Sequence, residues 1–261
     1  MVKKLVLLDK IYNIDSKKKE TEIFSRYLKY IEEFIKGNLN TTIEIKKLRN
    51  FDKRFEISIE GPEEIFIYNL LKKEIGILNN FEDIKIGDIY KGNITEPEKV
   101  GFGIFVDCGV INPNVDVLIN LHKLRDQLCE KKVKSLKEIL KAYGIVDHFP
   151  LHVKVISKDV SKQTIDGEIG QETLDLFNKI VNENIEAVFI SGETKGQFKK
   201  ALIRKGHLRD IVSIKRYSFL EHIAVFKEKT EAPGIIARIG NDLKKCKLSA
   251  IRSENIKQLL S

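Results

Sequence analysis

The stretch that decides the fold is Ile86–Leu124, which reads IGDIYKGNITEPEKVGFGIFVDCGVINPNVDVLINLHKL. Its apolar segments between glycine and proline turns predict three strands, one after Gly87-Asp88, one over Gly101–Asp107 and one over Val115–Leu121. Turns are expected at Glu96-Pro97-Glu98 and Asn112-Pro113, and Gly109 is expected to end the second strand. The stretch therefore predicts a small, strand-rich domain in the middle of the chain.

Three motifs of this stretch resemble the S1 domain, namely Ile86-Gly87-Asp88, Gly92-Asn93-Ile94-Thr95 and Phe105-Val106-Asp107-Cys108-Gly109. Further along, Leu151–Ile156 is similar to the fourth strand of that family, and Gln163–Ile169 is similar to its fifth. The resemblance covers residues 83–170. It implies a five-stranded OB-fold barrel that binds single-stranded RNA on an open face.

Two phenylalanines near the second strand are the candidates for stacking on bases. Such barrels hold bases on aromatic rings, at roughly 1–3 kcal/mol per base, while cations follow the phosphates. The resemblance implies that Phe102 and Phe105 both face outward. Strict alternation along a strand would place them on opposite faces, so a bulge near Gly101–Gly103 is needed to bring them together. The alternative is that one of the two rings belongs to the barrel core.

Further RNA contacts are expected on the same face of the barrel, from Lys91, Asn93, Asn120 and His122. Asn120 stands where typical members of the family carry a histidine. Where members often carry an arginine in the fifth strand, this chain has Thr164, followed by Asp166 and Glu168. Because carboxylates repel phosphates, a protein-docking role for this face is the alternative.

The segments on either side of the barrel predict two small α/β modules. Residues 1–80 predict a strand near Lys4–Leu8, a helix after Asp15-Ser16, two strands around Ile43–Ile45 and Phe55–Ile59, and a helix from Gly61 to near Gly76. This βαββα order is compatible with a ferredoxin-like or related two-layer sandwich. Residues 171–261 predict a helix over Thr173–Val181, strands over Ala187–Ile190, Leu208–Tyr217, Phe219–Phe226 and Ile235–Ile239, and a strand and a helix after Cys246.

The positive charge of the chain is concentrated at its far end. The net charge is +8, and residues 192–261 carry sixteen basic against seven acidic side chains, whereas residues 83–170 are balanced. This concentration is typical of a surface that binds a polyanion. A helix predicted from Thr194 would expose four of the cations, Lys195, Lys199, Lys200 and Arg204, while Phe198, Ala201 and Leu202 face inward. The alternative is a lysine-rich solvated surface.

The sequence offers little catalytic chemistry. It contains no nucleophile elbow, phosphate-binding loop or His-Glu-x-x-His motif. Cys108, Cys129 and Cys246 are odd in number and widely spaced, which predicts neither a disulfide framework nor a zinc site. Asp107, Asp116 and Asp147 are the candidates for a magnesium ion in a nuclease, against the ordinary interpretation as surface carboxylates. We therefore expect no catalytic residues, no metal and no cofactor.

The combined expectation is an α+β protein with a central five-stranded S1-like OB barrel at residues 83–170, between small α/β modules at residues 1–80 and 171–261. The whole arrangement is similar to an uncharacterised archaeal family with a central S1-like domain. We expect a non-catalytic RNA-binding protein of the cytoplasm, with ribosomal or other structured RNA as its partner. No apolar run approaches the ~18 residues that span a bilayer, and the absence of Trp with abundant Lys, Ile and Glu indicates a thermophile. The alternative is a protein-interaction factor that docks on transcription or RNA-decay machinery.

Overall fold

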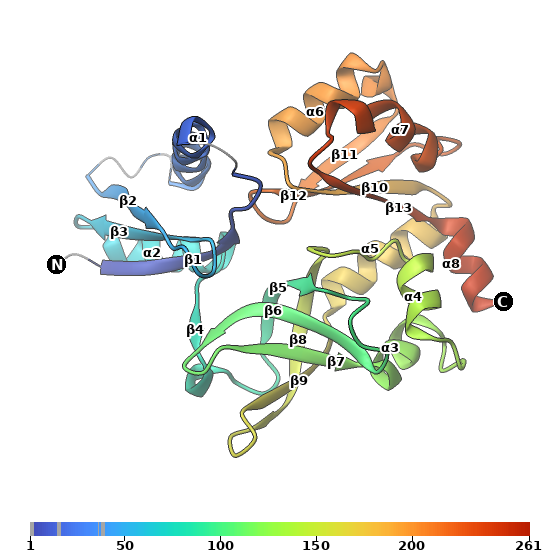
Figure 1. The fold of residues 1–261 in the computed structure, drawn as a ribbon, viewed down its shortest axis with the longest axis horizontal. Coiled ribbons are helices and arrows are strands. Elements are labelled where there is room, and N and C mark those ends of the chain that lie inside the picture. Colours follow the sequence, from blue (N-terminus) through green and yellow to red (C-terminus); the bar gives the residue numbers. More distant parts are fainter. Residues whose placement is uncertain (1–2, 15–16, 36, 38–39) are drawn as a thin grey trace. The chain divides into compact units, whose positions relative to one another are not determined.

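A computed structural model describes residues 3–14, 17–35, 37 and 40–261 (Figure 1). The chain divides into two compact units, Met1–Asn79 with Ser218–Leu220, and Asn80–Tyr217 with Glu221–Ser261. The expected division into residues 1–80, 83–170 and 171–261 stays a prediction. No helix within the described ranges is long and apolar enough to cross a bilayer.

The first unit has the predicted βαββα order, with β1 (Lys3–Lys10), α1 (Lys17–Phe34), β2 (Thr42–Leu48), β3 (Arg54–Glu60) and α2 (Glu64–Glu74). Its antiparallel sheet has the order β1-β3-β2. After α2 the chain makes an isolated antiparallel bridge, from Ile77 to Leu7 of β1, at the sheet edge where a ferredoxin-like fold has its fourth strand. Asp15 and Ser16, where the first helix was expected to start, lie outside the described residues.

The second unit begins, after β4 (Asn79–Asn80) and a 3₁₀ turn over Phe81–Asp83, with a closed barrel of five strands. These are β5 (Ile89–Thr95), β6 (Gly103–Ile111), β7 (Val115–Asn120), β8 (Pro150–Asp159) and β9 (Thr164–Ile169). Around the barrel the order is β6-β5-β8-β9-β7, closed by the β6–β7 pair, and β7–β9 is the parallel pair. The predicted five-stranded OB barrel is confirmed.

The prediction that Gly109 ends the second strand is wrong. β6 continues to Ile111, and its register with β7 shifts between Val106 and Val110. Gly109 sits in this bulge with φ +71°, a conformation that glycine adopts without strain, and its N–H donates to Asp107 Oδ1 at 2.9 Å. The glycine therefore bends the strand and does not terminate it.

Two helices that the sequence analysis did not anticipate connect β7 to β8, namely α3 (Leu121–Leu128) and α4 (Leu136–Ala142). Asn120 caps α3 by accepting from the Lys123 N–H at 2.9 Å, and Ser135 forms a capping box with Glu138 at the start of α4. Both helices contribute buried residues to the barrel core, among them Leu124 and Ile139.

The rest of the second unit is an antiparallel sheet covered by helices on both faces. Its elements are α5 (Gln171–Asn182), β10 (Glu186–Ser191), α6 (Lys195–Arg204), β11 (Ile211–Arg216), β12 (Glu221–Phe226), α7 (Ala232–Ile239), β13 (Lys247–Arg252) and α8 (Ser253–Leu260). The sheet order is β11-β12-β10-β13. This agrees with the predicted small α/β module.

Alternation along the central strand β10 assigns its two faces to different cores. Val188 and Ile190 pack with α6 and α7. Ala187 and Phe189 pack into the core that the barrel shares with α4, α5 and α8, where the Phe189 ring lies 4.9 Å from that of Phe149. The pair α6 and α7 therefore covers one face of the sheet, and α5 and α8 cover the other (Figure 1).

The prediction of a strand over Ile235–Ile239 is wrong, because the segment belongs to helix α7. Pro233 stands in the first turn, where a helix tolerates it. Ala232, Ile235 and Ile239 are buried and recur at helical spacing.

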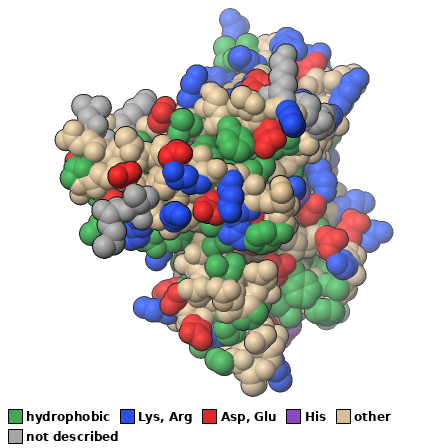
Figure 2. All heavy atoms as spheres, turned by 60° about the vertical axis from the view of Figure 1, so that its left-hand side comes forward, with side chains coloured by type: hydrophobic (Ala, Val, Ile, Leu, Met, Phe, Trp, Pro, Cys, Tyr) green, Lys and Arg blue, Asp and Glu red, His purple; other side chains and the backbone are tan. Residues whose placement is uncertain are grey.

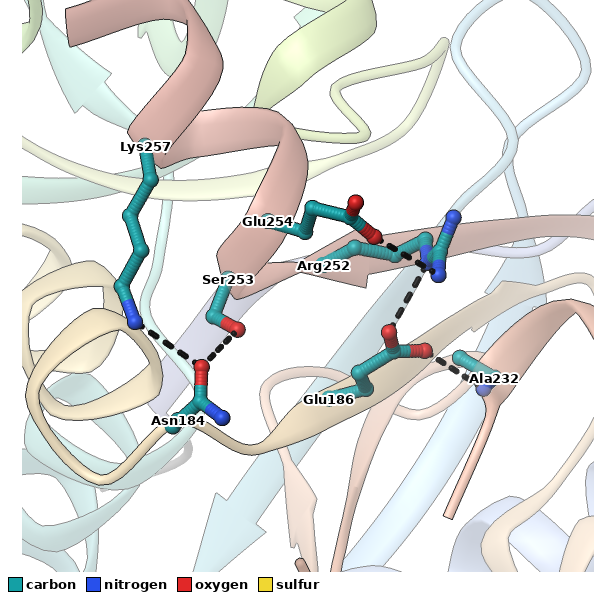
Figure 3. Close-up of polar contacts among 7 residues, drawn as sticks. All are labelled: Asn184, Glu186, Ala232, Arg252, Ser253, Glu254 and Lys257. Carbon is teal, nitrogen blue, oxygen red and sulfur yellow. Dashed lines mark hydrogen bonds and ion pairs between the residues drawn. The ribbon is translucent and has the colours of Figure 1, made fainter. Parts of the chain in front are cut away.

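Polar contacts fix β13 and α8 to the start of β10 (Figure 3). The Glu186 carboxylate accepts from Arg252 Nε at 2.8 Å and from the Ala232 N–H, at the first residue of α7, at 2.7 Å. Asn184 Oδ1 accepts from Ser253 Oγ at 2.9 Å and from Lys257 Nζ at 2.8 Å. The helix dipole also favours the Glu186 carboxylate at the N-terminus of α7. Glu186 and Asn184 therefore both have structural partners.

Candidate nucleic-acid interface

The two candidate stacking rings lie together on the outside of the barrel. Ile104 and Val106 are fully buried in the core, so alternation turns Phe105 outward, where it is half-buried. Phe102 precedes the first residue of β6 and is 56% exposed. The ring centroids are 6.1 Å apart, with an edge-to-face angle of 88°. Neither ring belongs to the core.

The bulge expected near Gly101–Gly103 is not present, because the strand begins at Gly103 and alternation does not extend back to Phe102. The carbonyl of Phe102 accepts from the Leu121 N–H at 2.7 Å, which fixes the backbone at this point. A Cβ on Gly103 would overlap the Ile119 carbonyl oxygen, so glycine allows β6 and β7 to approach closely here.

Lys91 and Asn93 extend the same outer face along β5. Gly92 between them and Ile94 after them are buried, so the two polar side chains point outward. Asn93 lies opposite Asp107 of β6, and Lys91 lies opposite His152 of β8. We define the outer face as Lys91, Asn93, Phe102, Phe105 and Asn120, on or next to β5, β6 and β7.

Asn120 and His122 stand at the end of this face. Asn120 Oδ1 accepts one capping bond of α3, while its NH₂ group can donate to a base or a phosphate. His122, in the first turn of α3, has a side chain that is 83% exposed and lies 3.6 Å from Asp126. The structure thus brings five of the predicted RNA contacts into one region and places His122 beside them.

Charges around the barrel are mixed. Lys123 and Lys154 lie 3.8 Å and 3.2 Å from the carboxylate of Glu168. Glu172 at the start of α5 lies 2.5 Å from Lys215 Nζ and 3.2 Å from His152 Nε2. In the view of Figure 2, basic and acidic side chains are likewise interspersed.

Burial sets the protonation state of His152 within this group. It lowers the pKa of the imidazole, an effect that the nearby Glu172 carboxylate opposes. His152 is therefore neutral at pH 7 and adds no charge to the outer face.

The predicted basic helix is α6, but it does not join the outer face. Phe198, Ala201 and Leu202 are buried as expected, and Lys199 and Lys200 are exposed. Arg204 lies 3.5 Å from Asp242. Helix α6 covers the sheet face opposite to the one that shares a core with the barrel, so Lys195, Lys199, Lys200 and Arg204 form a second, separate surface.

The three aspartates that were weighed as magnesium ligands each have a structural partner. Asp107 accepts from the Gly109 N–H, and Asp116 Oδ2 accepts from Thr95 Oγ1 at 3.1 Å. Asp147 Oδ2 accepts from Lys247 Nζ at 2.6 Å, and its Oδ1 accepts from the Glu96 N–H at 3.1 Å. Among the described residues no group of three or more His, Cys, Asp or Glu side chains is placed to hold a metal ion.

Asp147 is the residue whose role sequence reasoning missed. It connects the end of β5 to β13, although Asp147 and Lys247 are far apart in the sequence. Burial raises the pKa of Asp147, but the hydrogen bonds from Lys247 and Glu96 and the neighbouring His148 more than offset this, so its pKa lies below the ordinary value. The ionised carboxylate therefore holds the β5–β6 loop in place.

Several solved structures are similar to parts of the chain. An uncharacterized protein of Methanocaldococcus jannaschii is 21% identical, with 34% of this chain and 96% of that chain covered and a TM-score of 0.24. GSP13 of Bacillus subtilis is 22% identical, with 33% and 56% covered and a TM-score of 0.25. The intact alpha subunit of aIF2 from Pyrococcus abyssi is 11% identical, with 66% and 99% covered and a TM-score of 0.25.

No curated protein matches the chain. The finer assignment of the barrel to the S1 type stays a prediction. Residues 84–180, which hold the barrel and most of α5, match the DUF2110 central domain, and residues 185–251, which hold the following sheet, match the DUF2110 C-terminal domain.

Proposed function

We propose that the chain is an RNA-binding protein whose barrel holds single-stranded RNA on the outer face. The observation that carries this proposal is the pair Phe102 and Phe105, two neighbouring aromatic rings left accessible on an OB barrel. Leaving apolar rings in water has a free-energy cost, and stacking on bases removes it. Asn93 and the Asn120 amide add hydrogen-bonding groups beside the rings.

Stacking, rather than charge, supplies most of the affinity in this proposal. Lys123 and Lys154 share the carboxylate of Glu168, which weakens their attraction for phosphate. The cations of α6 then serve RNA that extends beyond the barrel, which suits a ribosomal or other structured RNA. No catalytic step is part of the proposal.

The test is a binding titration of the full chain with labelled single-stranded RNA of about 12 nucleotides, within the range that one OB-fold covers. Saturable binding should weaken as salt rises, because phosphate contacts release counterions. A duplex of the same length should bind more weakly, since its bases are stacked inside the helix. Absence of binding, or equal binding of the duplex, would refute the proposal.

A second function, docking of a protein partner, is favoured by acidic groups on the same strands. Asp107 and Asp116 point outward from β6 and β7, next to each other and both beyond the pair of Phe105 and the half-buried Leu118. An apolar centre with acidic neighbours suits a basic polypeptide such as a segment of transcription or RNA-decay machinery. A partner protein that the chain retains after ribonuclease treatment and at high salt would favour this function over RNA binding.

A further inference from the structure

A groove of about 630 Å³ lies beside the outer face. The β5–β6 loop, α4 with the turn after it, and β13 form its walls. Gly101, next to Phe102 in the chain, belongs to its lining. The groove therefore starts next to Phe102, at one edge of the outer face.

The groove is held in shape before any ligand arrives. Asp147 ties the β5–β6 loop to Lys247 of β13 through the two hydrogen bonds described above. Two residues further along β13, Ser249 Oγ donates to the Gly144 carbonyl at 2.6 Å. Gly144 has φ +62°, and a Cβ there would overlap the Ala250 carbonyl oxygen, so glycine lets the turn after α4 lie directly on β13.

The lining of the groove combines an apolar floor with a basic rim. Leu136, Leu140 and Ile145 contribute buried apolar surface, and Val100 is partly exposed. The lining contains three cations, Lys99, Lys137 and Lys141, and one carboxylate, that of Glu98. Lys99 pairs with Glu96 at 2.6 Å, whereas Lys137 and Lys141 are exposed on α4 and have no ion-pair partner among residues 3–14, 17–35, 37 and 40–261.

We propose that this groove takes the nucleotides that follow those stacked on Phe102 and Phe105, with Lys137 and Lys141 contacting their phosphates. The inference rests on the proposed RNA binding and extends it to a second subsite. Bases present an apolar π-face, which the floor matches, and every nucleotide carries a phosphate, which the lysine rim matches. Because β13 forms one wall, the subsite is incomplete in the barrel alone.

The experiment compares two lengths of oligouridylate on the full chain. An RNA of about 4 nucleotides covers the stacking rings alone, whereas one of about 12 nucleotides also reaches the groove. The test variant is Lys137→Gln with Lys141→Gln, two exposed positions whose replacement leaves the core intact. The matched control, Lys29→Gln with Lys72→Gln, makes the same charge change at exposed positions of α1 and α2.

The test variant should bind the longer RNA more weakly, and its salt slope should fall by about 1.4, or roughly 0.7 for each phosphate of a single strand that a lysine no longer neutralises. Its affinity for the shorter RNA and the behaviour of the control should equal those of the parent. The RNA subsite would be overturned if the salt slope of the test variant with the longer RNA equals that of the parent while Phe102→Ala still weakens the binding of both RNAs. The groove would then have another occupant, such as an acidic peptide. If the parent binds neither RNA, both the groove and the proposed function fail.

Discussion

Replacing Phe102 by alanine should separate RNA affinity from stability. The ring is 56% exposed, so its truncation removes less than half of the contact area that a buried phenylalanine would lose. Because full burial of such a side chain contributes about 1.5–3 kcal/mol, Phe102→Ala should lower the free energy of unfolding by at most about 1.3 kcal/mol. Loss of one stacked base costs about 1–3 kcal/mol of binding, which corresponds to a roughly 5- to 150-fold weaker Kd.

The assay is fluorescence anisotropy with labelled single-stranded RNA, combined with denaturant unfolding of the same samples. Phe66→Ala is the matched control, because Phe66 on α2 is also 56% exposed but lies outside the barrel. Phe105→Ala should weaken binding as well, and the double variant should be non-additive because the two rings touch. Equal losses of affinity in Phe66→Ala and Phe102→Ala, or no loss in either, would refute the stacking role.

Three further predictions concern charge and chemistry. Replacing the four cations of α6 together by glutamine should lower the affinity for long RNA. The salt slope should fall by about 0.7 for each phosphate that these cations neutralise in the parent. An unchanged slope would show that α6 is a solvated surface. Purified protein with magnesium or manganese should leave labelled RNA intact, and reproducible cleavage abolished by Asp107→Asn in a folded variant would contradict the non-enzymatic proposal. Asp147→Asn should lower stability at pH 7 by about 1–2 kcal/mol. Because the folded pKa of Asp147 is depressed, its contribution is present above its ordinary value and is lost as pH falls below about 4. Melting temperatures of parent and variant should therefore converge in acid, and a constant difference would refute this.

Hydrophobic patterning predicted most of the architecture. Alternation in Phe55–Ile59 and in the barrel strands, and helical spacing in α6, are local signals that the structure confirms. Ile235–Ile239 was misassigned because a short apolar run fits a strand or a helix, and the informative residue was Pro233 at the first helical turn. Gly109 was misread because a glycine in a bulge looks, in the sequence, like a glycine in a turn. The pairing of β6 with β7 continues past this bulge.

The candidate site was less predictable than the fold. Both phenylalanines were found from sequence, but their shared orientation depends on where β6 begins, and element boundaries are the least certain part of such reasoning. Asn120 was expected to face RNA, yet its Oδ1 also caps a helix that no pattern had indicated. The groove depends on contacts between α4, the β5–β6 loop and β13. No local pattern predicts such contacts, because Asp147 and Lys247 meet only in the folded chain.

The most direct test of the central claim uses the absence of tryptophan from the chain. Phe102→Trp introduces a single tryptophan on the outer face, and a base stacked on its indole should quench the emission. Titration with single-stranded oligouridylate should give saturable quenching with the same Kd as anisotropy, and Phe66→Trp should show none. Emission from the Phe102→Trp variant that does not change at saturating RNA would contradict stacking at this face.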